Sequence, residues 1–99
     1  MNQINAATLQ QRISNGERLN LLDVREPIEF YTYNIGGVNI PVSKLQQNMS
    51  SIIYNKTDEI IVICSAGIRS KTAQTILAEN GYQNMVNLKG GLKSLQKYI

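Results

Sequence analysis

The stretch IIVICSAGIRS, residues 60–70, decides the fold, because it joins a buried strand to the start of a helix. Four consecutive branched apolar residues over 60–63 predict a strand that is buried on both faces. After a short loop, a helix-like segment runs from Ser70 to Asn80. The only cysteine of the chain, Cys64, is therefore expected where the strand ends and the helix begins.

A loop of this kind favours a thiolate at Cys64. It can direct several backbone N–H groups at one point, and the helix dipole adds positive potential. The thiolate, rather than the thiol, is the nucleophile. Because the chain has no histidine, no Cys–His or Ser–His pair is available, and activation must come from backbone dipoles and cations. The structural alternative is a small buried hydrophobe that ends a strand.

Length and composition indicate one ordinary domain over residues 1–99. The chain is 42% hydrophobic, which is normal for a globular protein and enough for a single core. One cysteine cannot form an intramolecular disulfide, and without histidine no familiar metal-ligand spacing exists, so we expect neither a metal nor a cofactor. The polar N-terminus and the short apolar runs predict a cytoplasmic protein without a membrane partner.

The charge balance is mildly basic, with a formal net charge of +3. This value suits a small anionic substrate or an acidic partner and is too small to indicate nucleic acid. The basic residues of the second half gather modestly at Arg69 and Lys71 and at Lys89, Lys93 and Lys97. Most such lysines are expected to be simply solvated.

Helix and strand signals alternate along the rest of the chain. In the first half, we expect a helix over 6–14 capped by Asn5 and ended by Gly16, a strand over 19–24 and a short helix from Pro27. A short strand over 38–41 follows a Gly-Gly turn, and a helix capped by Ser43 comes next. In the second half, we expect the strand over 60–64, the helix over 70–80 ended by Gly81, a strand over 85–88 and a last helix after Gly90-Gly91.

Two of these helices have a predicted core face. After Ser43, the apolar residues Leu45, Met49, Ile52 and Ile53 recur at helical spacing. In the helix over 70–80, the residues expected to point inward are Ala73, Ile76 and Leu77.

Strands separated by crossover helices imply a parallel sheet covered on both faces. Ligands of such sheets bind outside the carboxyl ends of the strands. Cys64 lies at one strand end and Asp23 near another, so the two residues are expected to share a site.

Four sequence blocks carry a family resemblance. They are LDVREPIEF (22–30), IGGVNIP (35–41), CSAGIRS (64–70) and NLKGG (87–91), and their order and spacing over about residues 3–96 resemble a single-domain rhodanese. The resemblance implies a three-layer α/β/α fold with a five-stranded parallel sheet, whose first strand lies near Gln3-Ile4. It also implies a sulfurtransferase that carries a sulfane sulfur as a Cys64 persulfide. The donor would be a small anion such as thiosulfate or a polysulfide, and the acceptor a thiol or a protein.

For substrate binding, the resemblance and the loop chemistry together indicate Ser65, Ala66, Gly67, Ile68, Arg69 and Ser70. Their backbone N–H groups are expected to form an anion nest around the terminal sulfur. Gly67 permits a positive φ in that nest, although it is also typical of a simple turn. Ser70 is expected to cap the helix.

Two cations of the loop are candidates for a role beside Cys64. Arg69 is expected to bind the anionic end of the donor and to lower the pKa of Cys64. A cation in the first turn of a helix is otherwise unfavourable, which supports a functional reason for it. Lys71 is a weaker candidate, since exposed helix lysines are common.

Asp23 and Arg25 match the Asp-Val-Arg block of the family. As supporting residues they would line the rim of the site, with Asp23 bracing the Cys64 loop through hydrogen bonds to backbone N–H groups. The alternative is a strand-end turn at Asp23, with Arg25 paired to Glu26 or Glu29. Direct chemistry by Asp23 is disfavoured, because a carboxylate beside the thiolate opposes its ionisation.

The chain departs from the family pattern at two places. Tyr33-Asn34 stands where the family commonly has a histidine, and Leu95 stands where it often has a tryptophan. Both positions suggest packing or rim roles, so the departures bear on substrate preference and rigidity more than on the central chemistry.

Two other function classes use a loop of this kind. Dual-specificity tyrosine phosphatases of the same fold have five residues between Cys and Arg, whereas four separate Cys64 from Arg69. The shorter loop predicts a pocket for one sulfur atom rather than a tetrahedral phosphate. A non-enzymatic persulfide carrier or regulatory module stays open, because the same loop serves both roles.

Overall fold

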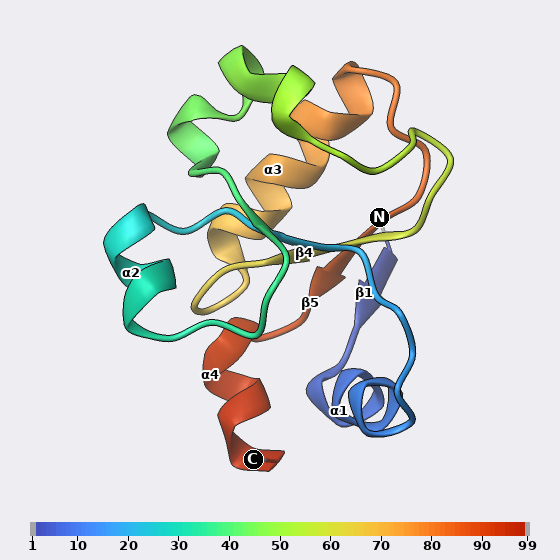
Figure 1. The fold of residues 1–99 in the computed structure, drawn as a ribbon, viewed down its shortest axis with the longest axis vertical. Helices are drawn as coiled ribbons and strands as arrows, with labels where there is room; N and C mark the ends of the chain where they lie inside the picture. Colours follow the sequence, from blue (N-terminus) through green and yellow to red (C-terminus); the bar gives the residue numbers. More distant parts are fainter. Residues whose placement is uncertain (1, 99) are drawn as a thin grey trace.

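Five parallel strands form one sheet in the order β1-β5-β4-β2-β3, as the computed structural model shows for residues 2–98 (Figure 1). The strands are β1 (Asn2–Ile4), β2 (Leu21–Asp23), β3 (Val38–Asn39), β4 (Ile60–Ile63) and β5 (Met85–Leu88). The helices are α1 (Ala6–Ser14), α2 (Pro27–Thr32), α3 (Ile68–Glu79) and α4 (Gly91–Leu95), with 3₁₀ turns η1 (Val42–Lys44), η2 (Gln46–Ser51) and η3 (Gln96–Tyr98).

The sheet separates two apolar cores, which confirms the predicted three-layer α/β/α architecture. Residues Ile60 and Val62 of β4 face a core that includes Ala73 and Leu77 of α3. The alternate residues Ile61 and Ile63 face the core of α1 and α4. All four β4 side chains have 0% exposure, and burying each fully contributes about 1.5–3 kcal/mol. The run over 60–63 is thus the centre of the fold, as predicted.

Local signals set the starts of α1 and α2. The Asn5 side chain accepts a hydrogen bond of 2.8 Å from the N–H of Thr8, which confirms it as the cap of α1. Pro27 occupies the start of α2, where its missing N–H costs nothing. Glu26 and Glu29 form a capping box around that start. The capping box brings Glu29 toward the carboxyl ends of the strands.

The predicted helix after Ser43 is wrong in type, whereas three of its four predicted core residues, Leu45, Met49 and Ile52, do pack in the core. The segment forms two 3₁₀ turns, η1 and η2, and Ser43 lies inside the first instead of capping a helix. Asn48 has non-helical φ and ψ angles, and Ile52 is extended. Since successive side chains of extended backbone point to opposite sides, Ile52 is buried whereas Ile53 is 78% exposed.

The start of α3 also differs from the prediction. The helix begins at Ile68, two residues early, because Gly67 adopts φ +94° and turns the chain directly into it. Ser70 is therefore not the N-cap. It lies in the first turn, fully buried, which frees its hydroxyl for other contacts. The inward positions Ala73 and Leu77 are buried as predicted, and Ile76 is half-buried.

Other predicted elements are present, although the strands expected over 19–24 and 38–41 are shorter than predicted. The strand expected over 19–24 is confined to Leu21–Asp23, and Gly81 follows α3 with φ +87°. Within residues 2–98, no helix combines the length and the apolar content that crossing a membrane requires.

Candidate active site

The sulfur of Cys64 lies at the focus of several hydrogen-bond donors. Its Sγ accepts the N–H of Gly67 at 3.0 Å and the N–H of Ser70 at 3.4 Å. The Ser70 Oγ lies 3.3 Å from the same sulfur. Only 1% of Cys64 is exposed. The loop between β4 and α3 therefore directs donors at Cys64 Sγ, and the predicted nest around a terminal sulfur stays a prediction.

These donors decide the ionisation of the thiol. Burial raises the pKa of Cys64, but the hydrogen bonds from the Ser70 side chain and from the N–H groups of Ser70, Gly67 and Ala66 lower it. The hydrogen bonds outweigh burial, so the pKa lies below its ordinary value. The thiolate is thus easier to form than in an ordinary cysteine, without a neighbouring base.

The double glycine at 90–91 supports this loop, a role that the sequence analysis missed. At the start of α4, the N–H groups of Leu92 and Lys93 donate to the carbonyls of Cys64 and Ser65 at 2.9 and 3.0 Å. A Cβ on Gly91 would overlap the carbonyl group of Ser65. Only glycine lets α4 approach so closely, and the signal that pointed to it was the family block at 87–91.

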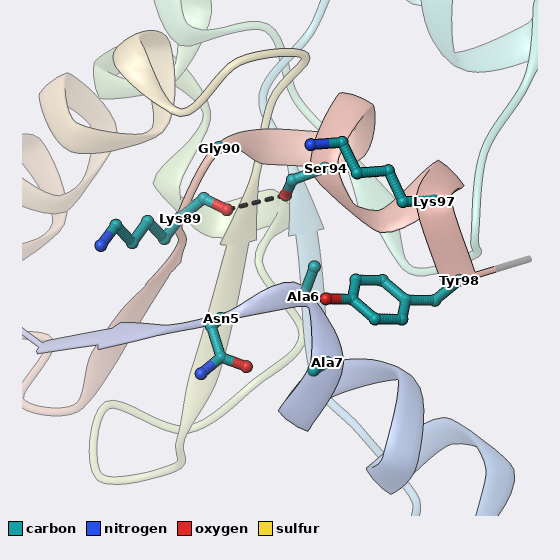
Figure 2. Close-up of a pocket in the computed structure, with 8 residues that line it drawn as sticks. All are labelled: Asn5, Ala6, Ala7, Lys89, Gly90, Ser94, Lys97 and Tyr98. Atoms are coloured by element: carbon teal, nitrogen blue, oxygen red, sulfur yellow. Dashed lines mark hydrogen bonds between the residues drawn. The ribbon is translucent and has the colours of Figure 1, made fainter.

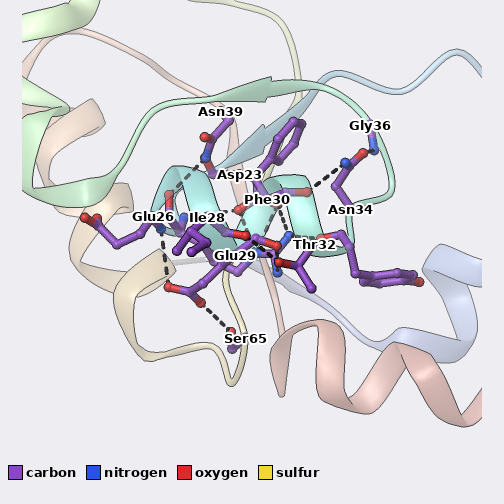
Figure 3. Close-up of polar contacts among 12 residues, drawn as sticks. Asp23, Glu26, Ile28, Glu29, Phe30, Thr32, Asn34, Gly36, Asn39 and Ser65 are labelled. Carbon is purple, nitrogen blue, oxygen red and sulfur yellow. Dashed lines mark hydrogen bonds and ion pairs between the residues drawn. The ribbon is translucent and has the colours of Figure 1, made fainter.

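Arg69 is paired with Glu29, and its binding of the anionic donor stays a prediction. Its Nη1 and Nη2 donate to the Glu29 carboxylate at 2.7 and 2.9 Å, and Ser65 Oγ also contacts both side chains. Glu29 reaches this point from α2 and points toward Ser65 (Figure 3). The Arg69 contact lowers the pKa of Glu29 to about 2, and Glu29 in turn raises the pKa of Arg69.

Arg69 therefore has a smaller effect on the pKa of Cys64 than the sequence predicts. The charge of Cys64 contributes to the raised pKa of Arg69, but less than Glu29 does. The foremost groups that lower the Cys64 pKa are hydrogen-bond donors of the loop, not the guanidinium. Glu29 entered the sequence analysis only as a candidate partner of Arg25, because nothing local indicates a contact across 40 residues.

The predicted bracing of the loop by Asp23 is wrong. Asp23 lies at the carboxyl end of β2, beside β4, and its carboxylate accepts hydrogen bonds from the N–H and guanidinium of Arg25. Arg25 also donates to the carbonyl of Glu29 within α2 and to that of Tyr33 at its end. The alternative pairing of Arg25 with a glutamate side chain is wrong as well. The pair thus anchors α2, and α2 holds Glu29 over the loop.

Lys71 lies near the loop without contacting the sulfur. It lines a hollow of about 110 Å³ together with Ala66, Gly67, Ile68 and Lys89. Its side chain is exposed, so its role in binding stays a prediction.

A larger cavity of about 450 Å³ lies between the start of α1 and the C-terminal helices (Figure 2). No thiol lines it, and the ammonium groups of its two lysines, Lys89 and Lys97, lie well apart in the picture. This cavity therefore offers no converging set of groups for chemistry. Among the residues that the structure describes, no cluster of three or more His, Cys, Asp or Glu could hold a metal ion.

The two departures from the family pattern occupy structural positions. Leu95 is fully buried in the core of α1 and α4. Asn34 closes the turn after α2, where its side chain donates to the Phe30 carbonyl and accepts from Gly36 N–H. The carbonyl of Tyr33 accepts from Arg25. Both departures thus lie outside the loop around Cys64.

Comparison with known proteins agrees with this geometry. A family model described as Rhodanese-like domain matches residues 5–98. A Bacillus subtilis protein named a putative sulfur carrier is 32% identical over 92 residues, which are 92% of this chain and 49% of that protein. A thiosulfate sulfurtransferase of Escherichia coli is 35% identical over 75 residues, covering 75% of this chain and 71% of the relative.

A solved structure supports the same assignment. The crystal structure of a Staphylococcus saprophyticus protein has a TM-score of 0.84 at 30% identity and covers 96% of this chain and 93% of its own. The fold, the loop at the end of β4 and the matched family model lead to one conclusion: the chain belongs to the family of rhodanese-like domains.

Proposed function

We propose that this protein is a sulfurtransferase, which takes a sulfane sulfur from thiosulfate or a polysulfide and passes it to a thiophilic acceptor through a Cys64 persulfide. Relatives named sulfurtransferase and thiosulfate sulfurtransferase support the general role. The observation that carries the specific proposal is the convergence of Gly67 N–H, Ser70 N–H and the Ser70 hydroxyl on one sulfur.

In the first step, the Cys64 thiolate attacks the outer sulfur of thiosulfate. The S–S bond of the donor breaks, and its electron pair leaves with sulfite. Cys64 then carries the outer sulfur as an anionic persulfide, and the total charge is unchanged. The N–H groups of Gly67 and Ser70 are already directed at Sγ, so they stabilise the thiolate at the start and the end of the cycle, and other N–H groups of the loop are proposed to stabilise the terminal sulfur of the persulfide.

In the second step, a thiolate or cyanide attacks the terminal sulfur of the persulfide. The S–S bond breaks, and its electron pair returns to Cys64 Sγ, which regenerates the thiolate. No metal or organic cofactor takes part in either step. The proposed setting is the reducing cytoplasm, where a single thiol stays free.

Intact mass spectrometry after incubation with thiosulfate, and separately with a polysulfide, tests this proposal. We expect the mass of one added sulfur on the wild type, its loss on addition of cyanide, and no addition to Cys64→Ser. A matched control moves the only thiol to an exposed position in Cys64→Ser/Ser43→Cys. If that variant is loaded by thiosulfate as fast as the wild type, the loop has no special role and the proposal is wrong.

Turnover separates the enzyme from a non-enzymatic carrier, the function that the Bacillus subtilis relative's name suggests. An enzyme converts many equivalents of thiosulfate and cyanide to thiocyanate, whereas a dedicated carrier loads once and turns over poorly. Release of phosphate from an aryl phosphate, without loading by any sulfur donor, would instead indicate the phosphatase alternative.

A further inference from the structure

A buried amide stands in the apolar strand β5. Asn87 is 1% exposed, and its neighbours Val86 and Leu88 are buried apolar residues. Asparagine is disfavoured in strands, and a buried amide is costly unless it is hydrogen-bonded. Here Nδ2 donates to the carbonyl of Gly67 at 3.4 Å, and Oδ1 accepts a hydrogen bond from the hydroxyl of Ser70. Both partners of the amide belong to the segment that surrounds Cys64 Sγ.

The Gly67 carbonyl sets the orientation of this amide. A carbonyl oxygen only accepts hydrogen bonds, so the atom of Asn87 that faces it must be Nδ2. The opposite atom, Oδ1, then faces Ser70, and Oδ1 also only accepts. The Ser70 hydroxyl must therefore donate its proton to Asn87.

The same hydroxyl lies 3.3 Å from Cys64 Sγ, and it has one proton for two acceptors. While Cys64 is a thiol, its S–H donates to Ser70 Oγ, and Ser70 donates to Asn87. When Cys64 is a thiolate, Sγ can no longer donate. A charged acceptor outcompetes a neutral amide oxygen, so the hydroxyl rotates toward the sulfur and leaves Oδ1 without a donor.

We propose that Asn87 is a positioning residue that opposes ionisation of Cys64 by competing with Sγ for the single hydroxyl proton of Ser70. The part that Asn87 plays in turnover rests on the proposed function. In the persulfide, the inner sulfur is neutral and the proton stays with Asn87. When the acceptor breaks the S–S bond and the electron pair returns to Sγ, the hydroxyl turns to stabilise the new charge.

A double-mutant cycle tests the competition without any sulfur donor. The rate of Cys64 alkylation by iodoacetamide is measured from pH 5 to 9 in the wild type, Asn87→Ala, Ser70→Ala and the double variant, with Cys64→Ser as the blank. Below the pKa, this rate follows the thiolate fraction. Removing one neutral hydrogen-bond competitor is expected to speed alkylation by about two- to tenfold in Asn87→Ala.

The decisive comparison is the Ser70→Ala background. There the hydroxyl is absent, so adding Asn87→Ala is expected to leave the rate unchanged. An amide that merely holds the loop through Gly67 would act in both backgrounds. The inference is overturned if Asn87→Ala slows alkylation, or if it speeds alkylation equally with and without Ser70.

If Asn87→Ala fails to fold, a second variant and a measurement on the wild type still test the proposal. Asn87→Val suits a strand and lacks the acceptor, so it should speed alkylation in the same direction. In the wild type, the side-chain amide NMR signals of Asn87 should titrate together with Cys64, and this coupling should vanish in Ser70→Ala. If the Asn87 amide signals do not shift as Cys64 titrates in the wild type, the proposed competition is contradicted. Because no sulfur transfer is read, a failure here is distinct from a failure of the persulfide proposal.

Discussion

Two ion pairs flank helix α2, and they differ in burial and in what they hold. The Asp23–Arg25 pair is closed off from water, with side-chain exposures of 0% and 6%. The Glu29–Arg69 pair is about one-third exposed, at 32% and 35%. The buried pair joins the end of β2 to the end of α2, whereas the exposed pair joins α2 to the loop that holds Cys64.

Because the two pairs differ in burial, we expect one to act on the stability of the fold and the other on the electrostatics of the site. A buried charge that loses its partner is left desolvated, so the Asp23–Arg25 pair cannot be broken cheaply. A pair in contact with water loses little when it breaks, but its charges still act on a nearby anion. We therefore expect the buried pair to control folding and the exposed pair to control the potential around the sulfur.

The largest effect is expected from Asp23→Ala, which leaves the Arg25 guanidinium buried without its carboxylate. Breaking a buried pair from one side costs about 3–5 kcal/mol of unfolding free energy. For a domain of this size, each kcal/mol lowers Tm by about 4–8 °C. Urea and thermal unfolding measure the loss, and Glu29→Ala is the matched control, with an expected loss below about 1 kcal/mol. Equal losses in the two variants would contradict the division of roles.

A smaller effect, on activity rather than stability, is expected from Glu29→Gln. The amide keeps the shape of the side chain but no longer neutralises Arg69. Thiosulfate is then attracted more strongly, and kcat/KM at low salt should rise by about three- to tenfold, mainly through KM. The gain should shrink at high ionic strength because salt screens exposed charges. Glu79→Gln, at the far end of α3, is the control for lost negative charge. A fall in kcat/KM would mean that Glu29 is needed chiefly to position Arg69.

The smallest effect concerns acid stability. The pKa of Glu29 is lowered from 4.5 to about 2 by Arg69, so the folded state favours its ionised form. This contribution is fully present above about pH 4.5, the unfolded value, and is lost as the pH falls toward 2. The stability difference between the wild type and Glu29→Gln should therefore shrink over this range in urea titrations. A difference that stays constant from pH 5 to pH 2 would show that Glu29 does not titrate in this way.

Much of the fold was predictable because its signals are local. The cap at Asn5 and the early helical position of Pro27 were predicted correctly, since each depends on contacts within one turn of the helix. The segment after Ser43 was predicted with the wrong helix type, because Leu45, Met49 and Ile52 reach the core at helical spacing although Asn48 interrupts the helical geometry. The start of α3 was also mistaken, since Gly67 rather than Ser70 turns the chain into the helix.

The sequence by itself determined that a single thiol, with no histidine to activate it, follows a strand buried on both faces. Apolar runs and their spacing carry that information, because burial depends mainly on side-chain character. Only the tertiary structure decided which groups meet around the sulfur. Asn87 reaches Ser70 from β5, Glu29 reaches Arg69 from α2, and Gly91 brings α4 against the loop. Hydrogen bonds depend on distances and angles between residues far apart in the chain, which a local pattern does not encode.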